Sequence, residues 1–489
     1  MFRRTDAQSN LFPAGGLSPE KHAACEKSWA GAFRREALPI LLRAEPNFAD
    51  MFNREHGRPN RSMALMLGVL MLKEMKDLTD EETVAALDFD ARWWYAFDGT
   101  IEQMHLCEKT LRNFRGRLMA HEKGEMLFRQ VTDELIAALG VKVEKQRLDS
   151  THILSNFAVL NRLGLMCETI RLFLRALRKE HRQLYDRIAG GVLKRHGEEY
   201  RYADARRGEG PRRLEVTARD VYRLVEQFGG HGAVSEMDEF KMLVRLYGEQ
   251  CDVLDKPASP KDGDDDGGDG PAPVKLKDAK KVGSRSLQTP HDPDVTYSGH
   301  KGKGYSVQIA ETCVKGNPVQ MITQVETTPA AQNDQKSTIP VLDALTKAKQ
   351  KPEELAADTS YSGSENASKA AALGVNLLAP APAKGKPEPG KQYDAPAATC
   401  PTDQKAAGEW LKAQEAQPEF KERYAIRAGI EATNSEYKRA HGGGRLRVRG
   451  GVRVKLAVYL KAAACNLKRA LRYWQSEAGW VMEGAVALA

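Results

Sequence analysis

The sequence lacks the features that mark secreted and membrane-spanning proteins. Its seven cysteines are scattered, odd in number and without a C-x-x-C pair, which argues against a disulfide framework and against a cysteine zinc site. The longest apolar run, MALMLGVLML at residues 63–72, is too short to span a bilayer. The opening residues, MFRRTDAQSN, contain no apolar signal region. We therefore expect a cytoplasmic protein in a reducing environment.

Length and charge narrow the class further. At roughly 100–200 residues per domain, 489 residues indicate two to four domains. Lys and Arg number 74 against 66 Asp and Glu, and the net charge of +8 is weak evidence for nucleic acid by itself. The distribution is more informative, because residues 421–473 hold fourteen Lys or Arg and only three Glu. This local excess predicts salt-dependent binding to a polyanion such as DNA.

The first part of the chain is predicted to be helical. Residues 1–55 are mixed in pattern and form an N-terminal extension, whereas residues 56–140 look like a helical domain. Thr79 followed by Glu82 predicts a capping box. The predicted helix 107–119 carries basic side chains and is a candidate reader of DNA, although a solvated helix face explains it about as well. These basic residues are Lys109, Arg112, Arg115 and Arg117.

The pattern changes at residues 141–155, where alternating apolar residues predict a first core strand that carries Asp149. Residues 156–257 return to helical periodicity and form a predicted helical insert. Residues 258–290 begin as an acidic stretch rich in Gly and Pro, with few apolar residues to bury. This composition predicts a flexible linker between the insert and the remainder of the core.

Strands and helices alternate over residues 291–440. Two strands joined by a KGNP turn at 315–318 precede a helix, and a short buried strand then ends at Asp358. Another helix and strand follow, after which residues 381–420 look like a loop. Residues 441–489 predict a basic hairpin or loop and a final helix. The chain thus predicts an α/β core, a mixed sheet with helices, behind an all-α N-terminal domain.

The stretch YAIRAGIEATNSEYK, residues 424–438, is predicted to form one helix with two different faces. At about 100° per residue, its polar residues Tyr424, Arg427, Glu431 and Lys438 fall within a sector of roughly 60°. The opposite side is apolar and suits packing on a core. It carries Ile426, Ile430 and Tyr437.

Three acids on separate elements suggest metal-dependent chemistry. Asp149 lies on one strand, Asp358 ends another, and Glu431 lies on a helix. Mg²⁺ prefers oxygen ligands, often a few carboxylates with water and phosphate oxygens. Two such ions about 3.5–4 Å apart can activate a water or a 3′-hydroxyl and stabilise the leaving oxygen of a phosphodiester.

The chain resembles the DDE transposases of bacterial insertion sequences. One branch of that superfamily carries the signature Y-(2)-R-(3)-E-(6)-K, and the spacing in residues 424–438 matches it throughout. LDSTH around Asp149 and ADTSYSG around Asp358 resemble the first two acid motifs, although Ser360 stands where relatives commonly have Gly. The segments GRPNRSMALML, DLTDEE and CEKTLRNFRGRL resemble the N-terminal domain of the same proteins.

The resemblance implies a fold, a function and roles for residues. It implies an RNase H-like core interrupted after its first strand by the helical insert, and catalysis with two Mg²⁺ ions, Mn²⁺ being a possible substitute. The protein would bind terminal inverted repeats, cleave DNA and transfer strands to target DNA, as a homodimer or larger synaptic complex in the bacterial nucleoid. The implied metal ligands are Asp149, Asp358 and Glu431, and the implied DNA contacts are Tyr424, Arg427, Lys438 and Arg439, with Arg112, Arg115 and Arg117 in the N-terminal domain.

Other interpretations remain open. Asp149 could cap a helix, Asp358 could be a turn residue, and Glu431 could form an ordinary ion pair with Arg427. Asp334 is a competing acid that suits a cap or turn, and His152 suits a structural role better than that of a base. An RNase H-like nuclease without strand transfer, or an inactive DNA-binding regulator derived from a transposase, would show many of the same features.

Overall fold

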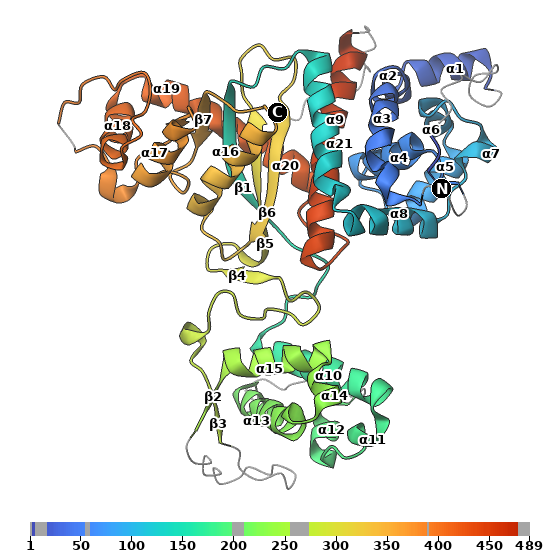
Figure 1. Cartoon of the computed structure of the whole chain (residues 1–489), viewed down its shortest axis with the longest axis vertical. Helices are drawn as coiled ribbons and strands as arrows, with labels where there is room; N and C mark the ends of the chain where they lie inside the picture. The colour runs from blue at the N-terminus through green and yellow to red at the C-terminus, as the bar shows by residue number, and fades with distance from the viewer. Residues whose placement is uncertain are drawn as a thin grey trace.

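The computed structural model describes residues 2–4, 17–53, 59–197, 210–254, 273–388 and 391–477. Figure 1 shows three regions: N-terminal helices, a central sheet with flanking helices, and a separate helical body formed by the insert. The linker predicted at 258–290 lies partly outside the described residues. Its described part is ordered, because it includes a strand and buried side chains such as Leu287 and Thr289. Residues 273–290 are therefore not the flexible linker that we predicted there.

The N-terminal region is helical, as the sequence predicts. Thr79 and Glu82 form the predicted capping box, with each side chain accepting from the other residue's backbone N–H. All residues of α4 (Met63–Met75) are buried. The other segments are α1 (Pro19–Glu26), α2 (Trp29–Ala32), the π-helix η2 (Phe33–Ala37), α3 (Leu38–Ala44), the 3₁₀ helix η3 (Glu45–Met51), α5 (Asp80–Phe89), α6 (Ala91–Ala96), α7 (Ile101–Met104), α8 (Glu108–Ala120) and α9 (Lys123–Leu139).

The last helix, α21 (Gly451–Glu477), joins the N-terminal helices to the sheet. In Figure 1 it stands beside α9, between the sheet and the remaining N-terminal helices. Its buried side chains belong to the same hydrophobic cluster as residues of α4, α9 and the sheet. The helix begins at Gly451, and the segment before it, for which we predicted a hairpin or a loop, is a loop. This segment pairs with residues that follow β1 (Lys145–Ile153) instead of folding back on itself: Leu154 forms an isolated bridge with Arg445, and Leu154 N–H donates to the Gly444 carbonyl.

A mixed sheet forms the centre of the molecule. Its strands follow the order β4-β5-β1-β7-β8, and β6 also pairs with β5. β1 is antiparallel to β5 and parallel to β7, while β7 is parallel to β8 and β5 is antiparallel to β6. The strands are β1 (Lys145–Ile153), β4 (Thr296–Ser298), β5 (Gly302–Thr312), β6 (Ile322–Pro329), β7 (Glu354–Ala357) and β8 (Asn376–Leu378).

Helices flank this sheet, so the α/β class predicted from the sequence is confirmed. α16 (Thr338–Lys347) and α17 (Ser364–Ala372) bury apolar side chains in one cluster with residues of β1, β5, β7 and β8. The 3₁₀ helix η6 (Asp334–Ser337) leads into α16. Short 3₁₀ turns η5 (Ala279–Lys281) and η7 (Ala383–Gly385) lie in the connections. Because β1 is central, a side chain at its middle lies at the heart of the sheet.

The insert folds around a hydrophobic cluster of its own. Figure 1 shows it as a body below the sheet, reached by connections at both ends. Its helices are α10 (Arg162–Glu180), α11 (Arg182–Tyr185), α12 (Gly190–His196), α13 (Gly210–Gly229), α14 (Gly232–Ser235) and α15 (Asp238–Gln250). The antiparallel pair β2 (Cys251–Val253) and β3 (Val274–Leu276) closes it.

One expected loop is a helix. We predicted a loop over residues 381–420, but α18 (Gln404–Ala416) lies within it. Asp403 caps this helix by accepting from Ala406 N–H at 2.9 Å. Its buried side chains recur at helical spacing and pack on residues of α17. These are Ala407, Trp410, Leu411 and Gln414.

Within the described residues, no helix is both long and apolar enough to cross a bilayer.

Candidate active site

Asp149 lies near the middle of β1, opposite Ile309 of β5. Its side chain is 14% exposed, and its carboxylate accepts from Ser150 N–H at 2.8 Å and from the Asn434 side-chain amide at 3.1 Å. Burial raises the pKa of Asp149 above its ordinary value, while the neighbouring Arg427 acts to lower it. A half-buried carboxylate with a raised pKa is one that a cation would stabilise in its charged form.

Asp358 directly follows β7, which runs parallel to β1. Its carboxylate accepts from Ser360 N–H at 2.7 Å, and its carbonyl accepts from Tyr361 N–H at 3.1 Å. The predicted turn therefore does follow the predicted strand. Because adjacent parallel strands point the same way, the end of β7 lies on the side of the sheet toward which β1 runs.

The segment that carries Glu431 is not one helix. α19 (Phe420–Tyr424) and α20 (Ile430–Arg439) are separated by the 3₁₀ segment η8 (Ala425–Gly429). The break arises because Arg147 of β1 reaches into it and donates to the Ile426 carbonyl at 2.8 Å. A Cβ added at Gly429 would lie 1.9 Å from Arg147 Nη1.

The apolar side of this segment packs as predicted. Ile430 and Tyr437 are fully buried, and the half-buried Ile426 packs against Phe420, Leu378 and Ala356.

Arg427 is the group that joins the three predicted acids. Its Nη2 lies 3.2 Å from the Asp149 carboxylate and 3.7 Å from that of Asp358, and its Nη1 lies 3.5 Å from that of Glu431. Arg427 is 18% exposed, whereas Glu431 is 71% exposed. Acids from a strand, a strand end and a helix thus face one guanidinium. They meet through Arg427 rather than directly, since their carboxylate oxygens do not all lie within 4.8 Å of one another.

Two of the other predicted phosphate-binding residues, Tyr424 and Lys438, lie near the same acids. Tyr424 stacks on Phe420 with ring centroids 5.4 Å apart, and burial raises the pKa of Tyr424. Lys438 is half-buried, and both burial and Lys301 lower its pKa while Asp149 raises it. Arg439 is exposed at the end of α20.

A network beside Asp149 was not predicted. Asp334 accepts from Lys301 at 3.0 Å, from the Ser150 hydroxyl at 3.0 Å and from the Gln308 side-chain amide at 2.9 Å. The competing acid is thus held in ion-pair and hydrogen-bond contacts. No local pattern marked Lys301, because the contact spans 33 residues.

His152 and Asn434 differ in what the sequence could indicate. His152 packs against Gly304, where an added Cβ would lie 2.7 Å from its Nε2, and burial lowers the pKa of His152. Asn434, which contacts Asp149, lies three residues after Glu431 on the same helix. The helical spacing i, i+3 was the available signal for Asn434.

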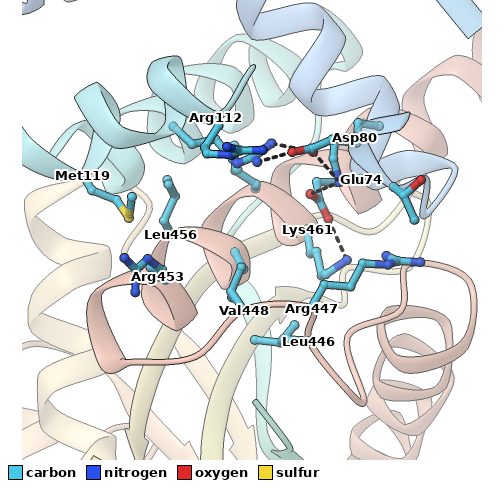
Figure 2. A pocket seen from close by; sticks show the side chains of 15 residues that line it. Glu74, Asp80, Arg112, Met119, Leu446, Arg447, Val448, Arg453, Leu456 and Lys461 are labelled. Carbon is cyan, nitrogen blue, oxygen red and sulfur yellow. Dashed lines mark hydrogen bonds and ion pairs between the residues drawn. The ribbon is translucent and has the colours of Figure 1, made fainter. Parts of the chain in front are cut away.

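The three arginines of α8 lie in a different region, on the far side of α21 from the sheet in Figure 1. Arg115 is ion-paired with Asp80, with Nη1 at 2.8 Å, and Arg117 donates to the Met51 carbonyl at 3.1 Å. Arg112 is exposed and lines a cavity of about 380 Å³. Figure 2 shows this cavity between α8 and the segment that includes Leu446–Val448 and Arg453. Its lining includes none of the three predicted acids.

Several basic side chains of residues 421–473 form ion pairs with acidic side chains of the same protein. Arg423 pairs with Glu354, Arg447 with Asp77, and Lys461 with the buried Glu74. Arg469 pairs with both Glu311 and Glu436. The count from the sequence therefore overstates the charge that this segment presents to solvent.

Fold and site together define an α/β protein with a helical N-terminal region and three carboxylates gathered around one arginine. Residues 391–471, which include Glu431, match the family described as Transposase DDE domain. Residues 35–117 match the family described as Transposase domain (DUF772). Both matches are to transposase families, and they cover two separate segments of the chain. Curated proteins give no match, and solved structures give none.

Proposed function

We propose that this chain is a DDE transposase that binds terminal inverted repeats, cleaves DNA with divalent metal ions and joins the ends to target DNA. The two transposase matches support the class. The observation that carries the chemistry is the convergence of Asp149, Asp358 and Glu431 on Arg427. Any one of these ion pairs could be structural, but three acids from distant segments around one cation are typical of a catalytic site.

The sheet supports an RNase H-like core. Its first strand is central, pairs antiparallel with β5 and parallel with β7, and is followed in the chain by the helical insert. This strand order is typical of RNase H-like folds. It would place Asp149 and Asp358 at neighbouring positions on adjacent strands, within reach of α20.

The donor set suits magnesium. Asp149, Asp358 and Glu431 offer carboxylate oxygens only, and these are the ligands of hard divalent cations. When bound, two Mg²⁺ ions, or Mn²⁺ in their place, would activate a water or a 3′-hydroxyl and stabilise the leaving oxygen. Burial raises the pKa of Asp149, so its charged form needs a nearby positive charge, which Arg427 supplies in this structure.

The surrounding side chains would hold DNA. Arg427 suits bidentate phosphate contact and Lys438 acts as a point charge, while Arg439 is exposed at the helix end, where it would meet the DNA backbone. Tyr424, stacked on Phe420, would hydrogen-bond a phosphate or stack on a displaced base. In the N-terminal domain Arg112 and Arg117 are both exposed, and Arg112 is the better placed for a repeat because Arg115 and Arg117 are engaged with protein groups. Handling two ends together requires a dimer or a larger complex.

A strand-joining assay tests this function. The full chain is incubated with Mg²⁺, pre-cut DNA ends that carry the element's inverted repeat, and a supercoiled target plasmid. The expected products are plasmids carrying one or two joined ends, and they vanish in EDTA. Cleavage of uncut ends without any joined product would identify a nuclease instead, and specific binding without either reaction would identify a regulator.

A further inference from the structure

A group of metal-ligand side chains lies at the other end of α20 from Glu431. Glu436 is on the last turns of α20, His441 follows this helix, and Cys465 lies in the middle of α21. One ligand atom from each lies within 4.8 Å of the other two. Among the described residues, no other trio of His, Cys, Asp or Glu meets this condition.

His441 is prepared as a ligand. Its side chain is fully buried, and its Nδ1 lies 3.1 Å from the Glu74 carbonyl oxygen, which can only accept a hydrogen bond. The Nδ1–H donor fixes the ring and leaves Nε2 for another partner, as in many metal-bound histidines. Within the described part of the chain, Nε2 is buried without a hydrogen-bond partner and lies 3.9 Å from Glu436 Oε1.

The other two side chains already contact each other, because the Cys465 thiol hydrogen-bonds Glu436, and metal binding would replace this bond. Glu436 Oε2 accepts from Arg469 at 3.0 Å, whereas Oε1 has contacts of 3.9 Å to His441 and 3.8 Å to Lys468. Cys465 is fully buried at the same place, and its environment includes Glu436 and Arg469. The three ligand atoms lie within 4.8 Å of one another, so small side-chain shifts would bring all three to bonding distance from one ion of the zinc class.

We propose that Glu436, His441 and Cys465 bind one transition-metal ion of the zinc class. A thiolate and an imidazole select a softer metal than Mg²⁺, so this site is distinct from the carboxylate site around Arg427. Its ligand set of one Cys, one His and one Glu leaves a fourth position for water. Arg469 and Lys468 beside Glu436 add positive charge, which the two anionic ligands and the nearby Glu311 offset.

The bound ion would fix the end of the α20 helix. It would join α20, the following loop and α21, and through the His441–Glu74 contact it would also connect to α4. Glu431 and Asn434 lie on the same helix, so the ion would hold the segment that presents them to Asp149. Binding replaces the Cys465 S–H bond by a metal–sulfur bond and releases that proton to solvent.

Cobalt titration of the tag-free, metal-stripped full chain tests the site. All titrations use protein that carries Asp149→Asn, because this change weakens metal binding at the carboxylate site. We expect near-ultraviolet thiolate-to-cobalt absorption that saturates at one Co²⁺ per chain and is displaced by Zn²⁺. Cys465→Ser should abolish this band and His441→Gln should weaken binding at least tenfold. Cys313→Ser, which changes a buried cysteine elsewhere, should leave both unchanged.

X-ray absorption at the zinc edge covers the case in which those variants fail to fold. The zinc-loaded protein with its natural Cys465 should show one sulfur at about 2.3 Å and nitrogen or oxygen neighbours at about 2.0 Å. Absence of a sulfur neighbour, absence of saturable uptake, or the same cobalt band in Cys465→Ser would overturn the site. The three residues would then be a buried ion pair beside an inert thiol.

Discussion

At the scale of the residue, Arg427 is the group on which the proposed chemistry depends. It contacts the carboxylates of Asp149, Asp358 and Glu431. Its positive charge therefore lies beside the same oxygen atoms that would bind metal ions. Arg427→Gln removes a competing positive charge from these acids. We therefore expect tighter Mn²⁺ binding by calorimetry, by about tenfold, together with DNA cleavage slower by a factor on the order of 10².

A matched control for Arg427 is Arg423→Gln. Arg423 lies one turn earlier and pairs with Glu354 at the surface. This variant should keep both metal affinity and cleavage close to those of the unchanged protein. Equal losses of both quantities in Arg427→Gln would show that Arg427 holds the acids in place rather than competing with metal.

The buried charge of Asp149 predicts a pH-dependent effect on stability. The pKa of Asp149 is raised in the folded state, so ionising it costs folding free energy once the pH exceeds the unfolded value. Asp149→Asn removes this cost, and its free energy of unfolding at pH 7 should increase. Urea unfolding at several pH values should show the gain shrinking as the pH falls through the raised folded pKa of Asp149 and vanishing below the unfolded value of about 4. A variant less stable than the unchanged protein at pH 7 would contradict the burial argument.

The spacing of polar residues in segment 424–438 predicted Arg427 and Glu431. The strand patterns predicted Asp149 and Asp358. The sequence did not predict the Lys301–Asp334 ion pair beside Ser150, because that contact depends on how β5 and η6 pack. Nor did it indicate that Arg427 faces all three acids. Helix geometry places residues on a face but says nothing of what lies opposite that face.

At the scale of the element, Gly429 permits the break before α20. Gly429→Ala would place a Cβ 1.9 Å from Arg147 Nη1, so Arg147 must leave the Ile426 carbonyl and shift from Glu311. We expect a loss of about 1–3 kcal/mol in the free energy of unfolding. Cleavage should fall as well, because Arg427 and Glu431 flank the displaced position.

Gly248→Ala in α15 is the control for Gly429. No atom lies within 4 Å of a Cβ added at Gly248, which is exposed near the end of its helix. Its stability, measured by urea unfolding, should rise by up to about 1 kcal/mol. If Gly429→Ala were as stable as Gly248→Ala, the Arg147 contact would not be what breaks the helix.

The prediction of helix or strand was correct where the sequence pattern was long. It was wrong where contacts between distant segments determine the local structure. The amphipathic pattern of residues 424–438 favours one continuous helix, but Arg147, which lies 279 positions before Ile426 and contacts its carbonyl, interrupts it. α18 was missed because Ala, Lys and Pro around it resemble a loop in composition. Its apolar residues nevertheless recur at helical spacing.

At the scale of the whole molecule, Lys461 links the two ends of the chain. Its Nζ lies 2.6 Å from the Glu74 carboxylate and donates to the His441 carbonyl, with all three residues buried. Lys461→Met keeps the volume but leaves Glu74 without its main partner. We expect the free energy of unfolding at pH 7, from urea titration, to fall by about 3–5 kcal/mol.

The Lys461–Glu74 pair also predicts how the free energy of unfolding changes at acidic pH. Burial acts to raise the pKa of Glu74, but Lys461 and Lys73 hold it below its ordinary value of 4.5. The stability due to the pair is present at neutral pH and is lost as the pH falls through the lowered pKa. Lys461→Met should therefore show a flatter acid dependence. Arg447→Ala, which breaks an exposed pair with Asp77, should cost less than about 1 kcal/mol, and an equal loss in both would contradict a special role for burial.

The general arrangement of the molecule followed from the sequence: helices first, then an α/β core with a helical insert. The shared core of α21, α4, α9 and the sheet did not follow from it. The periodicity of apolar residues in the last helix shows which face is buried. It does not show which distant element that face packs on.

The central claim, that Asp149, Asp358 and Glu431 carry out cleavage, is tested most directly by removing one charge at a time. Cleavage of inverted-repeat DNA in Mg²⁺ is measured for Asp149→Asn, Asp358→Asn and Glu431→Gln, alongside gel-shift binding to the same DNA. We expect each variant to lose cleavage by a factor on the order of 10² or more while repeat binding persists. Near-normal cleavage by any one of the three would remove that residue from the site.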